Sequence, residues 1–104
     1  MKINGIEYGL IYDVEAHCEY EDFIIKHPEV GQATASIELA IIMNREYNKK
    51  HGLKEPVLKK SEIAQLPFYE YKELKAAVDA QVKMDSERTV EAAPGKAKAA
   101  GKEN

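Results

Sequence analysis

The stretch ATASIELAIIMNREYNKKH, residues 33–51, decides the fold that this sequence predicts. Its apolar side chains cover more than one side of a helix, which is wider than packing against a single neighbour requires. These apolar residues are Ile37, Leu39, Ala40, Ile41, Ile42 and Met43. Gly52 is typical of the position after a helix end, and the basic residues of the last turns suit the helix dipole. We therefore expect a central core helix here, with Leu39, Ile42 and Met43 as surplus apolar surface for an interface.

A first helix is predicted before this one, from Asp13 to about His27. Asp13 is a good N-cap residue, and Glu15 places an acid in the first turn, where the helix dipole favours negative charge. Pro28 ends the helix, because the residue before a proline disfavours helical geometry. The acids between the apolar positions of this helix are expected to face water.

The first twelve residues predict a β-hairpin. Asn4 and Gly5 suit a two-residue turn, because both residue types tolerate the positive φ angles that it needs. The turn pairs Ile3 with Ile6, Lys2 with Glu7 and Met1 with Tyr8. The second strand is expected to continue to residue 12, so the backbone groups of residues 9–12 would lack a partner strand, and such an edge invites pairing with another chain. We expect Tyr8, Leu10 and Tyr12 to contact a second copy or a partner protein there.

The residues after the central helix predict a loop, a short helical turn and a longer helix. Residues 53–60 contain a proline and form the loop, and Ser61 is expected to cap a turn that ends at Leu66. Pro67 suits the first turn of the last helix. Apolar residues then recur at helical spacing to about Arg88.

The composition changes beyond Arg88. Residues 89–104, TVEAAPGKAKAAGKEN, hold no large apolar residue after Val90, so they cannot bury enough surface to stay ordered. We predict a single helical domain with an N-terminal hairpin over residues 1–88, and a disordered low-complexity tail over residues 89–104. The fold class is mainly α (α+β), with a short N-terminal β-hairpin followed by three to four helices.

Length and composition indicate one small, soluble domain. The chain has 104 residues, of which 44% are hydrophobic and 32% charged. The longest apolar run, from Leu39 to Met43, is far shorter than the roughly 20 residues of a bilayer-spanning helix, so we expect no membrane span. No apolar leader follows Met1, and the single cysteine cannot form an internal disulfide. A reducing cytoplasm fits these features best.

The charges are segregated along the sequence. Residues 1–31 hold two lysines against seven acids, whereas residues 45–60 hold six bases against two acids. The basic stretch is interpreted as the basic end of a helix and its loop, which complements the helix dipole. A nucleic-acid patch is the alternative, but the stretch holds a single aromatic residue and lacks the stacking side chains of single-strand binders. Opposite charges on one chain would also suit head-to-tail self-association.

Candidate catalytic or metal-binding chemistry is sparse. The three histidines lie in separate regions, without the close His or Cys spacing of a zinc site. Asp13, His17 and Glu21 share one stripe of the first predicted helix, which could hold a divalent ion but is more typical of a solvated face. Cys18 follows His17, yet adjacent helical residues point about 100° apart, so we interpret Cys18 as a small core residue. We expect no enzyme activity, no metal and no cofactor.

Three segments together resemble a known family. The hairpin KINGIEYGL (residues 2–10), the acidic helix DVEAHCEYEDF (13–23) and the closing segment LKKSEIAQLPFYEYKELKAAVDAQV (58–82) are similar to the tail assembly chaperones of long-tailed bacteriophages and prophage-like elements. The resemblance covers roughly residues 1–88, and its motifs are diffuse, with no catalytic or ligand residue to match.

The resemblance implies a small helical, non-enzymatic protein of the bacterial host cytoplasm. Such a chaperone binds the tape-measure protein until tail-tube subunits polymerise around it, and it is absent from the finished virion. We therefore expect the tape-measure protein as partner, the tail-tube protein as a second candidate partner, and a homo-oligomer. The alternatives are a structural virion or head–tail joining protein and, less favoured, a small DNA-binding regulator.

Overall fold

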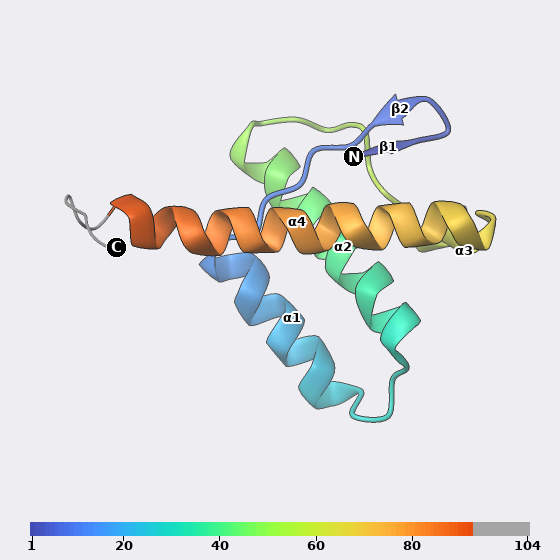
Figure 1. Ribbon diagram of the computed structural model, residues 1–104, viewed down its shortest axis with the longest axis horizontal. Coiled ribbons are helices and arrows are strands. Elements are labelled where there is room, and N and C mark those ends of the chain that lie inside the picture. The colour runs from blue at the N-terminus through green and yellow to red at the C-terminus, as the bar shows by residue number, and fades with distance from the viewer. Residues whose placement is uncertain (93–104) are drawn as a thin grey trace.

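Two short strands are followed by four helices in the computed structural model, which describes residues 1–92. The elements are β1 (Lys2–Ile3), β2 (Ile6–Glu7), α1 (Val14–Lys26), α2 (Gln32–Lys50), α3 (Lys60–Ala64) and α4 (Phe68–Ala92). Figure 1 shows α1 and α2 running antiparallel, with the long α4 crossing α2; the strands lie above α4 in this view, on the same side as the C-terminal end of α2. The predicted mainly helical fold with an N-terminal hairpin is confirmed.

The hairpin has the predicted turn and register. Asn4 and Gly5 have φ angles of 52° and 80°, as a type I′ turn requires. Lys2 pairs with Glu7 and Ile3 with Ile6, and the Tyr8 amide donates to the Met1 carbonyl oxygen at 2.6 Å. Strand β2 ends at Glu7, however, and does not continue to residue 12.

The backbone beyond β2 is bonded to helices, so the predicted unpaired edge is wrong. The Ile11 amide donates to the Met43 carbonyl oxygen at 3.3 Å, and the Gly9 carbonyl oxygen accepts from Asn44 Nδ2 at 3.0 Å. The Tyr12 amide donates to a carboxylate oxygen of Asp85 on α4 at 2.8 Å. The sequence pattern predicts an extended segment here, but a backbone carbonyl within α2 and two side chains, instead of a strand, supply its partners.

Helix α1 begins and ends where local chemistry predicts. The Asp13 carboxylate accepts from the Ala16 amide at 2.8 Å, and His27 is the C-cap residue, directly before Pro28. The prediction that Cys18 lies in the core is wrong, because Cys18 is exposed. It follows the fully buried Ala16 by two residues, which is about 200° around a helix.

Helix α2 is the central helix that the sequence predicts. It packs against α1, α3 and α4. Ala40 and Met43 are fully buried in a core that also includes Tyr8 of the N-terminal segment, Leu74 and Val78 of α4. Gly52 follows the helix with a φ of 65°, the left-handed conformation that glycine adopts most easily.

Two buried asparagines of α2 hold the loop between α2 and α3. Asn44 Oδ1 accepts from the Leu58 amide at 2.9 Å, and Asn48 Nδ2 donates to the Pro56 carbonyl oxygen at 2.9 Å. Helix α3 starts at Lys60 without a side-chain cap, so the prediction that Ser61 caps it is wrong. Helix α4 runs to Ala92, four residues past the predicted end, and residues 93–104 of the predicted tail lie outside the described residues. Within residues 1–92, no helix combines the length and apolar content needed to cross a membrane.

Candidate functional site

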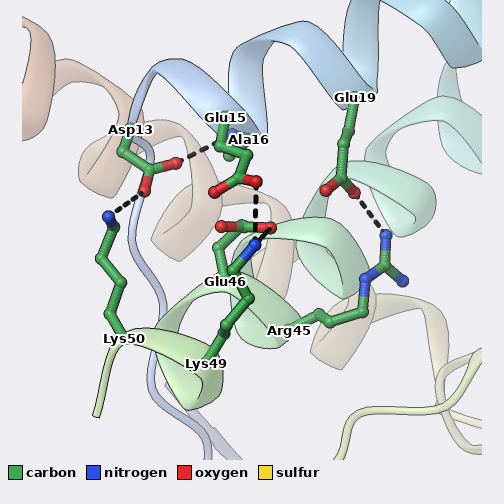
Figure 2. A network of polar contacts seen from close by, with 8 residues as sticks. All are labelled: Asp13, Glu15, Ala16, Glu19, Arg45, Glu46, Lys49 and Lys50. Atoms are coloured by element: carbon green, nitrogen blue, oxygen red, sulfur yellow. Dashed lines mark hydrogen bonds and ion pairs between the residues drawn. The ribbon is translucent and has the colours of Figure 1, made fainter.

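Opposite charges meet where α1 packs on α2. Figure 2 shows this cluster, which we call the α1–α2 charge network; it consists of Asp13, Glu15, Glu19, Arg45, Glu46, Lys49 and Lys50. Lys50 Nζ lies 3.1 Å from Asp13 Oδ2, Lys49 Nζ lies 2.8 Å from Glu15 Oε2, and Arg45 pairs with Glu19. Each step forward along α1 is matched by a step back along α2, as expected for antiparallel helices. The segregated charges of the sequence are therefore joined within the molecule.

Glu46 is the unusual member of this network. Its side chain is 1% exposed, and Lys49 Nζ is 3.7 Å from its Oε2 atom. Its Oε1 atom has no hydrogen-bond partner among the described residues. Burial, a hydrogen bond that the protonated carboxyl can donate to Glu19, and the charge of Glu15 raise the pKa of Glu46 to about 7. Glu46 was not predicted as a functional residue from the sequence. The signal that could have found it is an acid one turn after Ile42, on the apolar side of the helix.

Asp13 and Glu15 behave as ion-pair partners. The hydrogen bond and charge of Lys49 hold the pKa of Glu15 below its ordinary value. Burial raises the pKa of Asp13, but the Ala16 amide and the Lys50 ammonium outweigh it, so this pKa also lies below its ordinary value.

Three carboxylates of the network lie close enough together to be considered as metal ligands. One oxygen each of Asp13, Glu15 and Glu46 lies within 4.8 Å of the others. Such oxygen ligands suit Mg²⁺ or Ca²⁺. The ammonium groups of Lys49 and Lys50, however, already contact all three of these carboxylates.

Asp13, His17 and Glu21, which the sequence places on one stripe of the first helix, do not form a common site in the structure. Asp13 is turned toward the Ala16 amide and Lys50. His17 Nδ1 bonds to the Tyr12 hydroxyl, while its Nε2 atom lies 3.9 Å from Glu21. Among residues 1–92, the structure thus groups Asp13 with acids that the sequence pattern did not select.

The six predicted interface residues lie in or against the core of a single copy. Tyr8, Ile42 and Met43 are buried, whereas Leu10, Tyr12 and Leu39 are half-buried against the core cluster. Their contact with a partner stays a prediction. Tyr8 and Leu10 also line a surface groove, described next.

A largely apolar groove runs between α4, the N-terminal segment and the loop after α2. We call it the α4 groove; its lining includes Leu10, Tyr47, Leu53, Pro56, Ala80 and Met84, together with the polar residues Glu7, Asn48 and Gln81. Its volume is about 590 Å³. Leu53 is 45% exposed and Met84 is 52% exposed, so two large apolar side chains of its walls face solvent. Sequence reasoning missed both, because Leu53 lies in an irregular loop and Met84 falls outside the buried stripe of α4.

Comparisons with protein-family models, with curated proteins and with solved structures found no match to this chain.

Proposed function

We propose that this protein is a non-enzymatic tail assembly chaperone that holds a helical segment of a tape-measure protein in the α4 groove. The observation that carries the proposal is the exposure of Leu53 and Met84 on the walls of an apolar groove. Grooves of this kind accept the apolar face of an amphipathic helix. The family resemblance of the sequence supplies the identity of the partner, which is a long helical chain.

Buried and exposed apolar residues have different roles under this proposal. Tyr8, Ile42 and Met43 are needed to fold one copy, so replacing them would test stability instead of binding. Leu53 and Met84 can be changed with little effect on stability, since exposed positions away from special contacts tolerate substitution.

Co-purification of the tagged chain with its tape-measure protein tests the proposal. Leu53→Asp and Met84→Asp, alone and together, should weaken capture by about tenfold or more, because a charge in the groove must be desolvated when a helix docks. Val14→Asp is the matched control, since Val14 is 79% exposed and lines a separate hollow near Tyr12. Unchanged capture by the groove variants would contradict the proposal.

Mass spectrometry of purified particles separates the chaperone from a joining protein. A chaperone is absent from finished particles, whereas a head–tail joining protein is present in stoichiometric amount. Recovery of this protein from purified particles in stoichiometric amount would therefore overturn the chaperone assignment.

A further inference from the structure

The α1–α2 charge network holds more acids than bases. Its acids are Asp13, Glu15, Glu19 and Glu46, and its bases are Arg45, Lys49 and Lys50. Each base has a close partner among the acids of α1. Glu46 shares Lys49 with Glu15. The Lys49 Nζ atom is 3.7 Å from Glu46 Oε2 but 2.8 Å from Glu15 Oε2.

Glu46 is also the member that water cannot stabilise. Its side chain is 1% exposed, and its Oε1 atom has no hydrogen-bond donor among residues 1–92. The carboxylates of Glu15 and Glu19 face it from α1. An ionised carboxylate can accept a hydrogen bond but cannot donate one. A proton on Glu46 would remove the buried charge and supply an O–H donor to one of these acceptors.

A divalent cation is the other species that could neutralise the cluster of Asp13, Glu15 and Glu46. Lys49 contacts Glu15 and Glu46, and Lys50 contacts Asp13, so a cation would have to displace an ammonium group. A proton requires no such displacement. The geometry therefore favours proton binding.

We infer that Glu46 is a proton-dependent contact between α1 and α2: when protonated it hydrogen-bonds to the acids of α1, and when ionised it repels them and loosens α1. The groups that face it are Asp13, Glu15 and Glu19 from α1, and Arg45, Lys49 and Lys50 from α2. This inference is independent of the tape-measure proposal.

The sign of the pH effect follows from the direction of the shift. The pKa of Glu46 is raised from 4.5 to about 7 in the folded protein, so folding binds a proton between these values. The stabilisation from Glu46 is complete below pH 4.5 and is lost as the pH rises through about 7. Asp13 and Glu15 have lowered pKa values, so their contribution is lost only at acidic pH and does not mask this change.

Release of α1 would uncover apolar surface. Ile42 lies one turn before Glu46 on the same face of α2, and it is buried in the closed form. Ile42 is among the residues predicted from sequence to form an interface, so ionisation of Glu46 would make that residue available to a partner.

Thermal unfolding of the full chain from pH 5.5 to 8.5 tests the inference with Glu46→Gln, which mimics the protonated side chain. The wild-type Tm should fall by roughly 5–10 °C over this range, whereas the variant should show little change and exceed wild type at pH 8.5. Glu29→Gln removes the same charge from an exposed loop and should behave like wild type. All three chains keep the histidines, so histidine titration cancels in the comparison. Equal pH dependence of wild type and Glu46→Gln would overturn the inference.

Three further measurements cover a misfolded variant, the release of α1 and a bound cation. Carboxyl carbon NMR of the wild-type chain should give a midpoint near pH 7 for Glu46, and a midpoint near 4.5 would refute proton binding without any variant. Amides of α1 should lose protection from hydrogen exchange relative to those of α4 as the pH rises. If millimolar CaCl₂ or MgCl₂ raised the Tm at pH 8.5 for wild type but not for Glu46→Gln, the cluster would be a cation site and the inference would fail.

Discussion

Gly9 is a residue at which the fold leaves no room for a side chain. The ring of Tyr47 on α2 lies against its backbone, and a Cβ atom at Gly9 would lie 2.2 Å from the ring carbons Cδ1 and Cε1. A methyl group must therefore displace the ring or the N-terminal segment. We predict that Gly9→Ala lowers the free energy of unfolding by about 1–3 kcal/mol, as overpacking of a filled site does. Urea denaturation measures this change.

Gly31→Ala is the control for that substitution. Gly31 is the N-cap of α2, and a Cβ atom there meets no other atom within 4 Å. Alanine is less favourable than glycine at an N-cap, so this substitution should cost about 0.5–1 kcal/mol, without any steric cost. Equal denaturation midpoints for the two variants would show that Tyr47 moves aside without cost.

Elements whose limits depend on neighbouring residues are the ones that the sequence predicts well. The hairpin register follows from Asn4 and Gly5, the start of α1 from Asp13, and its end from Pro28. The end of α2 follows from Gly52 in the same way. In each case the decisive chemistry lies within one turn or one hairpin, so no knowledge of the packed fold is required.

Features that depend on distant residues could not be predicted in this way. The extended segment after β2 bonds to α2 and α4, which a strand pattern cannot reveal. Buried Asn44 was not predicted, because its role appears only when Gly9 and Leu58 both reach it. The α1–α2 charge network had a signal in the segregated charges, but pairing them requires knowing that the two helices are antiparallel.

Asp13 combines a helix cap with an interhelical ion pair, so its loss should weaken α1. It accepts from the Ala16 amide and lies 3.1 Å from the Lys50 ammonium. We predict that Asp13→Ala lowers the free energy of unfolding by about 1 kcal/mol, chiefly through the lost cap. Circular dichroism during denaturation measures it. Asp22→Ala removes an exposed acid paired with Lys26 inside α1 and should cost only a few tenths of a kcal/mol; an equal cost would argue against a special role for the cap.

Across the whole molecule, the charges that the sequence separates are joined by folding. Three bases of the 45–60 stretch, Arg45, Lys49 and Lys50, pair with acids of α1. These contacts occupy the part of the basic stretch that lies in α2. They account, inside one copy, for three of the six bases of this stretch and for three of the seven acids of residues 1–31.

The bond between the Tyr12 amide and Asp85 ties the N-terminal segment to α4 across 73 residues of sequence. Asp85 also accepts from Gln81 on its own helix. We predict that Asp85→Ala lowers the free energy of unfolding by about 1–3 kcal/mol, because the partly buried Tyr12 amide loses its acceptor. Urea denaturation measures the loss, and hydrogen exchange at the Tyr12 amide should rise with it.

Asp79→Ala is the matched control on the same helix, since it removes an acid from an exposed pair with Lys75 and should change stability by a few tenths of a kcal/mol. The dependence of the unfolding free energy on urea distinguishes two outcomes for Asp85→Ala. An unchanged slope means that the N-terminal segment and α4 still unfold together, so the lost bond lowers the stability of the whole fold. A reduced slope with rapid exchange confined to residues 8–12 would mean that this segment detaches first, and the bond would then hold one segment without stabilising the rest.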